Sequence, residues 1–214
     1  MKLSSVVPDI VPGIFKRLFG GTQHPDPVVI VSGLPRSGTS MLMGMLAAGG
    51  LELVIDGVRT ADEDNPQGYY ELERVKELDK AGDTSWLAEA HGKGIKIISF
   101  LLQHLPDRYT YKIIFMRRNL PEVLASQRKM LQRRDEEPGN VDDEELAKVF
   151  EAHLQKVKRQ LESRPNCDVL YVEHRDTMHS PAKVAGEINS FLDERLDVAA
   201  MTRVVDKQLY RNRV

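Results

Sequence analysis

Near its start the chain carries the segment Val28-Val29-Ile30-Val31-Ser32-Gly33-Leu34-Pro35-Arg36-Ser37-Gly38-Thr39-Ser40. Four β-branched residues in a row, between Pro27 and Gly33, predict a short buried strand. The apolar residues 42–48 predict a helix directly after it. Between strand and helix, glycines let the chain turn sharply, so that several backbone N–H groups point into one hollow at the positive end of the helix. We therefore expect this loop to bind a phosphate.

The two glycines of the loop have the spacing of the nucleotide-binding motif Gly-x-x-x-x-Gly-Lys-[Ser/Thr]. The lysine of that motif is missing, because Thr39 follows Gly38. Enzymes that act on nucleoside triphosphates use the lysine to reach the β- and γ-phosphates, and the next hydroxyl to hold Mg²⁺. Neither role is clearly filled here, and the cation of the loop is Arg36, inside the turn.

A second phosphate site is predicted after the apolar residues 111–116. Arg118 follows this predicted strand, and Ser126 lies eight residues further on, in the first turns of a helix that Pro121 suits as a starting residue. An arginine and a serine in these positions can converge on one dianionic phosphate, the arginine by a bidentate fork and the serine by its hydroxyl.

Together, the two motifs resemble those of the sulfotransferases that use 3′-phosphoadenosine-5′-phosphosulfate (PAPS), and the chain looks like a small bacterial-type member. The loop of that family is typically Pro-[Lys/Arg]-Ser-Gly-Thr-[Thr/Ser]. Its 3′-phosphate motif has an arginine, an acidic residue and a serine; Glu122 stands here where aspartate is commoner. The resemblance covers residues 28 to about 192. It implies that PAPS is bound by Pro35, Arg36, Ser37, Gly38, Thr39, Ser40, Arg118 and Ser126.

The resemblance also implies the catalytic residues. Arg36 would hold the 5′-phosphosulfate and stabilise the leaving group, 3′-phosphoadenosine-5′-phosphate (PAP). The catalytic histidine of the aryl-type branch is absent, since Lys96-Ile97-Ile98-Ser99 stands in its place. Branches without it use a glutamate as the base, and Glu71 is the best-placed candidate, with Glu73 and Asp64 behind it. An acidic residue in the first turn of a helix, which stabilises the helix dipole, is the other interpretation of Glu71.

His174 occupies the place where the family has an aromatic residue that contacts adenine, often a tyrosine. A histidine at a strand end with an ordinary structural partner is the alternative. The family's C-terminal glycine-rich basic segment has no clear match, and whether Arg203, Arg211 and Arg213 replace it stays open. No metal is implied, because the acidic residues 62–64 lack histidine or cysteine partners.

Strand and helix patterns alternate along the chain. Strands are expected at 28–31, 95–98, 111–116 and 169–172, and a short strand or extended piece at 51–55. Helices are expected at 42–48, 71–81, 121–134, 142–163 and 180–192. This alternation predicts an α/β fold, with a mainly parallel central sheet covered by helices on both faces, in a three-layer sandwich of the P-loop type. We expect an N-terminal extension, residues 1–27, and a single domain, residues 28–214.

Composition excludes several classes of function. With 214 residues and a formal charge of −2, the chain has no overall field that attracts nucleic acid. It has one cysteine and no apolar run of the roughly 20 residues that a membrane helix needs, so we expect a cytoplasmic protein. Residues 10–19 form an amphipathic pattern that we expect to pack on the domain; membrane contact is unlikely but stays open, as does a homo-oligomer.

The sequence thus predicts a sulfotransferase that moves a sulfuryl group from PAPS to a hydroxyl or amine. The acceptor, whether a small molecule, a glycan or a lipid, is not specified by these patterns. One alternative is a P-loop kinase or hydrolase with a degenerate loop, which the acidic Glu173 after the apolar residues 169–172 favours. Another is a nucleotide-binding protein without turnover, because the general base is the least secure residue.

Overall fold

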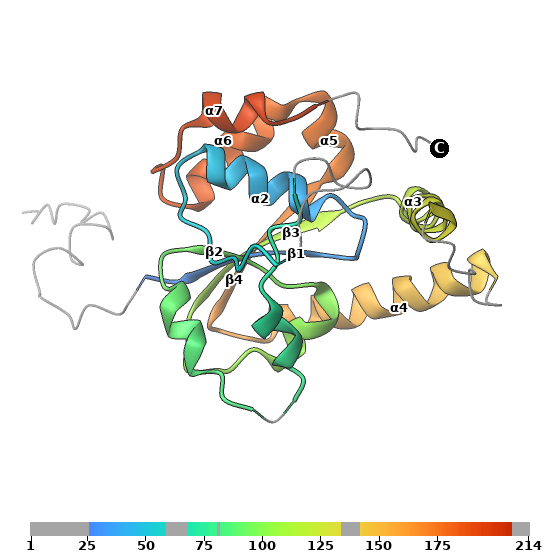
Figure 1. The fold of residues 1–214 in the computed structure, drawn as a ribbon, viewed down its shortest axis with the longest axis horizontal. Coiled ribbons are helices and arrows are strands. Elements are labelled where there is room, and N and C mark those ends of the chain that lie inside the picture. Colours follow the sequence, from blue (N-terminus) through green and yellow to red (C-terminus); the bar gives the residue numbers. More distant parts are fainter. Residues whose placement is uncertain (1–25, 59–67, 81, 134–141, 207–214) are drawn as a thin grey trace, which may run out of the picture.

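The computed structural model describes residues 26–58, 68–80, 82–133 and 142–206 (Figure 1). The strands are β1 (Val28–Gly33), β2 (Gly94–Lys96), β3 (Tyr111–Arg117) and β4 (Cys167–Glu173). The α-helices are α2 (Thr39–Ala48), α3 (Leu120–Arg133), α4 (Asp143–Glu162), α5 (His174–His179), α6 (Pro181–Phe191) and α7 (Val198–Arg203). Three 3₁₀-helices are η1 (Glu73–Glu77), η2 (Ser85–Ala90) and η3 (Ser99–His104).

The four strands form one sheet in the order β2-β1-β3-β4, and each neighbouring pair is parallel. Helices α2, α5, α6 and α7 lie above the sheet in Figure 1, and α4 and the 3₁₀-helices lie below it. The predicted α/β class and three-layer arrangement are therefore confirmed. Because all strands run the same way, the loops after β1, β2, β3 and β4 meet at one edge of the sheet, where such folds bind ligands.

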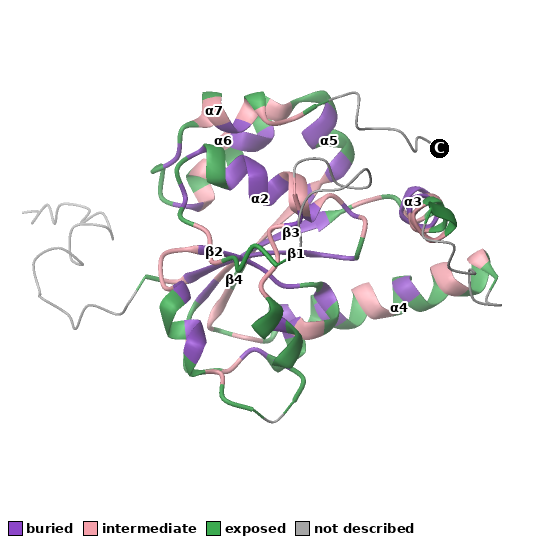
Figure 2. Ribbon diagram, in the orientation of Figure 1, coloured by how far each residue is buried: buried purple, intermediate pink, exposed green. Residues whose placement is uncertain are grey.

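Strand β1 is buried along its whole length, which explains its continuous apolar sequence (Figure 2). Its side chains alternate between two cores. Val28 and Ile30 pack with the 3₁₀-helices and α4, whereas Val29 and Val31 pack with α2, α6 and α7. The loop that follows β1 is thus attached to the most deeply buried strand of the sheet.

The segment 51–55, expected to be a short strand or an extended piece, is the extended piece, with an isolated parallel bridge between Leu53 and Gly94. Three residues further on, the Asp56 carboxylate accepts hydrogen bonds from the amides of Val58 and Glu73. The backbone of 52–54 still bonds to the start of β2, since Val54 N donates to Gly94 O and Gly94 N donates to Glu52 O, each over 2.8 Å.

The helix expected at 71–81 is only the 3₁₀-helix η1, which starts two residues later. In a 3₁₀-helix, residues three apart eclipse one another, so Val75 and Leu78 are both buried in the core below the sheet. The strand expected at 95–98 ends at Lys96; Ile97 N still donates to Val31 O (3.0 Å), and Ile98 then precedes η3.

Residues 173–176, expected to link a strand to a helix, end β4 and begin the additional helix α5. Helix α4 forms nearly as predicted, within 142–163. The extension 1–25, the acidic residues 62–64 and the tail arginines Arg211 and Arg213 lie outside the described residues. Within the described ranges, no helix combines the length and apolar character needed to cross a bilayer.

Candidate functional site

The loop between β1 and α2 has the backbone shape of an anion cradle. Arg36 (φ 67°) and Gly38 (φ 105°) both have positive φ, which turns the chain into the first turn of α2. That first turn contains no acidic residue, and its N-cap residue, Gly38, has no side chain to cap it. The positive end of the helix dipole therefore favours an anion in front of α2.

Position 38 requires glycine for two reasons, its positive φ and a close neighbouring side chain. A Cβ on Gly38 would lie 2.7 Å from Cδ2 of His174, the first residue of α5. At the other glycine, a Cβ on Gly33 would lie 2.6 Å from both Met116 O and Ser37 Oγ. The loop is thus packed tightly between β3 and α5.

The two motifs meet in space although they lie 90 residues apart in the chain. Arg36 Nε donates to Ser126 Oγ over 3.1 Å, and Arg118 Nη1 donates to the carbonyl oxygen of Arg36 over 3.1 Å. Arg118 Nε also donates to Glu122 Oε2 over 2.9 Å. One hydrogen-bonded network, which we call the Arg36–Arg118 network, therefore joins Arg36, Arg118, Glu122 and Ser126.

The ion pair in this network is nearly shielded from water. The side chains of Arg118 and Glu122 are 9% and 7% exposed. Removing one member of such a pair leaves an uncompensated buried charge, which is strongly destabilising. Glu122 thus holds Arg118 in place beside the loop.

The Ser37 hydroxyl has hydrogen-bonding capacity that no described residue uses. Its Oγ is buried and has no hydrogen-bond partner among the described residues. A buried hydroxyl without a partner costs free energy that an oxygen of a bound ligand would recover. Thr39 is buried in the first turn of α2, and the half-buried Ser40 donates to Tyr69 O over 3.5 Å.

His174 lies against the loop rather than at an exposed strand end. It is buried, and burial together with the positive charge of Arg118 lowers its pKa to about 4. The imidazole is therefore neutral near pH 7 and supports Gly38 as a packing surface. A contact between His174 and adenine stays a prediction.

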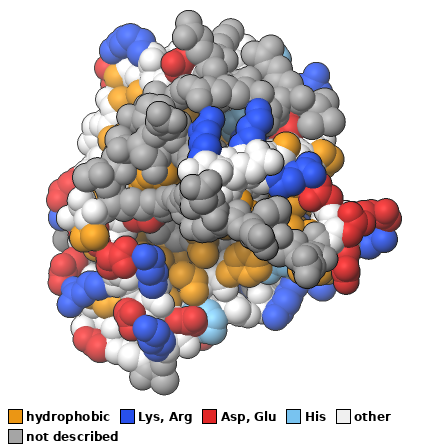
Figure 3. Space-filling view, turned by 45° about the vertical axis from the view of Figure 1, so that its right-hand side comes forward, with side chains coloured by type: hydrophobic (Ala, Val, Ile, Leu, Met, Phe, Trp, Pro, Cys, Tyr) orange, Lys and Arg blue, Asp and Glu red, His pale blue; other side chains and the backbone are white. Residues whose placement is uncertain are grey.

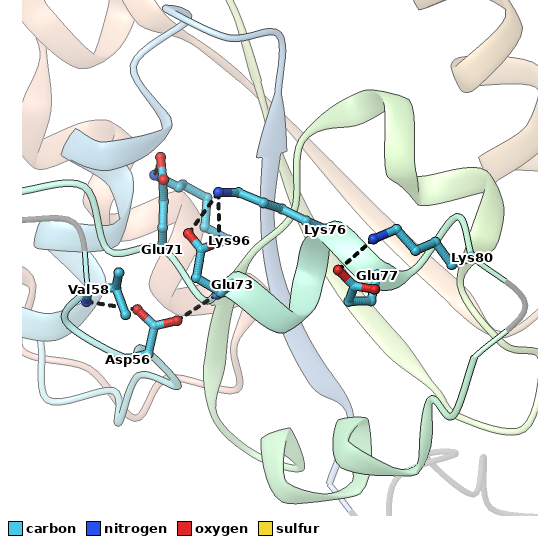
Figure 4. Close-up of polar contacts among 8 residues, drawn as sticks. All are labelled: Asp56, Val58, Glu71, Glu73, Lys76, Glu77, Lys80 and Lys96. Carbon is cyan, nitrogen blue, oxygen red and sulfur yellow. Dashed lines mark hydrogen bonds and ion pairs between the residues drawn. The ribbon is translucent and has the colours of Figure 1, made fainter.

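Glu71 lies on the β2 side of the loop, beside a buried lysine (Figure 4). Lys96 Nζ, at the end of β2, lies 3.3 Å from Glu71 Oε1 and also donates to the carbonyl oxygen of Tyr69. The side chain of Lys96 is 6% exposed and that of Glu71 is 25% exposed. Because Ser40 also reaches Tyr69, the segment with Glu71 is attached to both α2 and β2.

Lys96 was not predicted as a site residue. In the sequence, Lys96 stands out as a charged residue inside the apolar run 95–98. This is the place where the aryl-type branch has its catalytic histidine. A buried lysine needs a partner, and here Glu71 provides it. Of the other candidate bases, Glu73 forms an exposed ion pair with Lys76, and Asp64 lies outside the described residues.

Glu173, the acidic residue that favoured the kinase interpretation, ends β4 and binds Arg117 Nε over 2.8 Å. A cavity of about 760 Å³ lies beside it, at the ends of β3 and β4. Ser37, Arg118 and Glu122 contribute to its wall.

Within the parts of the chain that the structure describes, no group of three or more histidine, cysteine, aspartate or glutamate residues is arranged to hold a metal ion.

No protein-family model matches the chain, and no curated protein matches its sequence significantly. Several solved sulfotransferases are similar to it in structure. A mouse sulfotransferase, SULT7A1, complexed with PAP, is 14% identical with a TM-score of 0.48, over 84% of this chain and 62% of the other. A sulfotransferase from Alicyclobacillus acidocaldarius is 15% identical with a TM-score of 0.46, over 81% and 85%.

An unliganded sugar kinase from Janibacter sp. HTCC2649 is also similar, at 16% identity and a TM-score of 0.39, over 85% of this chain and 99% of the other. The chain spans 62% of the length of the mouse sulfotransferase.

Proposed function

We propose that this chain is a sulfotransferase that moves a sulfuryl group from PAPS to a hydroxyl or amine acceptor. The observation that supports it most is the Arg36–Arg118 network, in which two cations and Ser126 gather beside an anion-binding loop that lacks the triphosphate-binding lysine. A ligand with two separate anionic groups fits such a site, one group at the loop and one at Arg118 and Ser126.

The residues present fit PAPS. The amides before α2 and the Ser37 hydroxyl suit the oxygens of the 5′-phosphosulfate, with Pro35, Thr39 and Ser40 completing the loop. When bound, PAPS supplies the sulfuryl group and leaves as PAP. Arg36 would exchange its hydrogen bond to Ser126 for one to the nucleotide and stabilise the charge that develops on the leaving oxygen.

Glu71 is proposed as the general base that takes the proton from the acceptor. The ammonium group of Lys96 fixes the position of the Glu71 carboxylate, and its own positive charge lies beside the loop where negative charge develops. Glu71 lies on the β2 side of the loop and Arg118 on the β3 side, so the acceptor would approach from β2. We also propose a small-molecule, glycan or lipid acceptor, one domain over 28–214, and a cytoplasmic location.

The role of Arg118 is tested by comparing two nucleotides that differ only in the 3′-phosphate. Replacing Arg118 by Ala should weaken PAP binding roughly 10- to 100-fold, because a charge-assisted hydrogen bond contributes about 1.5–3 kcal/mol. Binding of adenosine-5′-phosphate should change little. Isothermal titration calorimetry measures both affinities, and equal losses for the two nucleotides would remove the proposed 3′-phosphate site.

Two further variants make this test specific. Arg117→Ala removes the neighbouring arginine, which is half exposed and pairs with Glu173, and should leave PAP binding unchanged. Because Arg118→Ala leaves Glu122 buried without its partner, the double variant Arg118→Gln/Glu122→Gln removes both charges of the pair. A folded double variant should show the same selective loss of PAP affinity.

The kinase alternative has one observation against it in this site. The carboxylate of Glu173, which would have to hold Mg²⁺, is already bound to Arg117. A protein that binds the nucleotide without turnover has the same nucleotide site, and only a measurement of sulfuryl transfer separates it from the enzyme.

A further inference from the structure

Glu71 lies in a segment outside the regular helices and strands, so local contacts have to orient its side chain. Its side chain is 25% exposed. Figure 3 brings forward the side of the molecule where the loop after β1 lies, and the acidic and basic side chains visible there are mixed rather than gathered by sign. Such a mixture produces no field of one sign that could orient the Glu71 carboxylate.

Tyr70, the residue before Glu71, has a backbone conformation that tyrosine rarely adopts. Its φ is 50°, in the left-handed region where the Cβ atom crowds the backbone. Arg36 of the phosphate loop is another described residue with a positive φ, 67°. A conformation of this kind costs free energy, and it persists only where the surrounding structure determines it. The contacts around Tyr70 therefore have to hold the turn.

The backbone is held on both sides of Tyr70. The carbonyl oxygen of Tyr69 accepts a hydrogen bond from Lys96 Nζ, and the carbonyl oxygen of Glu71 accepts one from Asp56 N over 3.3 Å. The turn lies between these two bonds and directs Glu71 Oε1 to Lys96 Nζ, 3.3 Å away (Figure 4). One ammonium group thus binds acceptors on both sides of the turn.

The Tyr70 ring attaches this turn to the core above the sheet. It packs against the apolar cluster that α2, α6 and α7 form with the sheet. A Cβ on Gly44 of α2 would lie 3.4 Å from Tyr70 Oη and 3.2 Å from Cγ1 of Val204, the residue after α7. The ring therefore lies over Gly44, beside the end of α7.

Gly44 points to the same contact. It lies in the middle of α2, where a glycine weakens a helix relative to an alanine. Its φ is not among the positive values found at other glycines of the chain, so its conformation does not require glycine. The narrow space under Tyr70 and Val204 does favour a residue without a side chain.

We propose, resting on the sulfotransferase function above, that Tyr70 is the positioning residue of the general base. Its ring fixes a left-handed turn to α2, and this turn holds the Glu71 carboxylate on Lys96. The phosphate loop leads into the start of the same helix. Helix α2 therefore sets the distance between the base and the bound sulfuryl group.

The first test detects the position of Glu71 without turnover. Nitrogen NMR of the full chain measures how fast the ammonium protons of Lys96 exchange with water. Exchange should be slow in the unmodified chain and in Tyr70→Phe, which keeps the ring. It should be roughly tenfold faster or more in Tyr70→Ala, because the charge-assisted hydrogen bond to Glu71 is lost. Tyr70→Leu, a smaller change to the core, should also accelerate it.

The matched control is Tyr109→Ala. Tyr109 is likewise partly buried, but it packs against the core below the sheet, two residues before the start of β3 and thus at the opposite edge. Its loss should lower the free energy of unfolding in urea to a similar extent and leave the exchange of Lys96 slow. Fast exchange in the unmodified chain, or slow exchange in folded Tyr70→Ala and Tyr70→Leu, would overturn the proposal.

The second test is a double-mutant cycle on the release of PAP from PAPS, with 2-naphthol and with glucosamine as acceptors. Tyr70→Ala should lower kcat roughly 10- to 100-fold, because it displaces the base, and should leave the PAP dissociation constant unchanged. In a chain that already carries Glu71→Gln, it should lower kcat no further.

An equal loss of kcat in both backgrounds would show a general structural effect and overturn the positioning role. A failure of the sulfotransferase function gives a different result. In that case the unmodified chain neither binds PAP nor releases it from PAPS, while the exchange rates of Lys96 still show whether Tyr70 holds Glu71 in place.

Discussion

The two sides of the phosphate loop are built from different kinds of structure. On the β3 side, Arg118 and Ser126 come from the end of a central strand and from the first turns of α3. On the β2 side, Glu71 comes from an irregular segment before the 3₁₀-helix η1, beside a strand of three residues. The nucleotide would therefore be held by the regular sheet edge, and the acceptor by the segments around it.

Their electrostatics differ in the same way. The β3 side has a buried ion pair and a hydroxyl in direct contact with the loop arginine. The β2 side has one buried lysine paired with a partly exposed glutamate. We therefore expect substitutions on the β3 side to change nucleotide affinity, and substitutions on the β2 side to change turnover or acceptor binding.

The largest expected effect is on turnover. Replacing Glu71 by Gln should lower the rate of sulfuryl transfer on the order of a hundredfold or more, about 3 kcal/mol in activation free energy, because the amide cannot take the acceptor proton. The PAP dissociation constant should stay the same, since Glu71 is on the β2 side.

The matched control is Glu73→Gln, because Glu73 is exposed and pairs only on the surface with Lys76 among the contacts described. Steady-state kinetics and calorimetry measure the two quantities for each variant. An unchanged rate in Glu71→Gln would refute the assignment of the base, and a parallel loss of PAP affinity would mean that the two sides are not separable.

The next largest effect is expected on the stability of the fold, from a substitution in the phosphate loop between β1 and α2. Gly38→Ala should destabilise the fold by about 2 kcal/mol more than Gly50→Ala. Both glycines have positive φ, 105° and 96°, but a Cβ on Gly38 would meet His174, whereas a Cβ on Gly50 meets nothing within 4 Å. Urea unfolding measures both free energies, and equal losses would contradict the close packing of His174 on the loop.

A pH effect of similar size should come from His174. Burial and the charge of Arg118 hold its pKa at about 4, below the 6.5 of an unperturbed histidine. As the pH falls below 6.5, the unfolded chain binds a proton that the folded chain rejects, so the free energy of unfolding should fall by about 2 kcal/mol between pH 7 and pH 5.

His174→Asn removes this titration, so its stability should depend less on pH over that interval. His104→Asn, at an exposed position of η3, should keep the slope of the unmodified chain. Urea unfolding at several pH values provides the measurement. The same slope in all three proteins would show that His174 is not the group responsible.

The smallest effect is expected at Ser126. Its hydroxyl accepts one hydrogen bond, so Ser126→Ala should weaken PAP binding by roughly 3- to 10-fold, about 1 kcal/mol, with little change for adenosine-5′-phosphate. Ser163→Ala, which removes an exposed hydroxyl at the end of α4, is the control. Isothermal titration calorimetry measures the affinity of each variant for both nucleotides. An unchanged PAP affinity in Ser126→Ala would show that Ser126 does not bind the 3′-phosphate.

The parts of the fold that could be predicted from sequence are those with strong periodicity. The apolar runs of β1 and β3 are buried, and α4 buries Phe150, Val157 and Leu161 of its apolar stripe, so these patterns reflect the tertiary structure. The segment 51–55 is the extended piece that the sequence allowed, whereas the helix predicted at 71–81 was wrong, since only the 3₁₀-helix η1 forms there.

The same contrast applies to the site. Arg36, Arg118 and Ser126 belong to local motifs, and their meeting could be expected once the strands were taken as parallel neighbours. The pairing of Lys96 with Glu71 depends on how an irregular segment folds back beside β2, which spacing along the chain does not encode.

The central claim is that this chain binds a 3′-phosphorylated nucleotide rather than a nucleoside triphosphate. Calorimetric titration of the unmodified chain with PAP without metal, and in parallel with ATP and Mg²⁺, tests it most directly. Our account predicts the tighter binding for PAP, because Arg118 and Ser126 would recognise the 3′-phosphate and Thr39 replaces the lysine that reaches a triphosphate. Tighter binding of ATP with Mg²⁺ would contradict it and favour the kinase alternative.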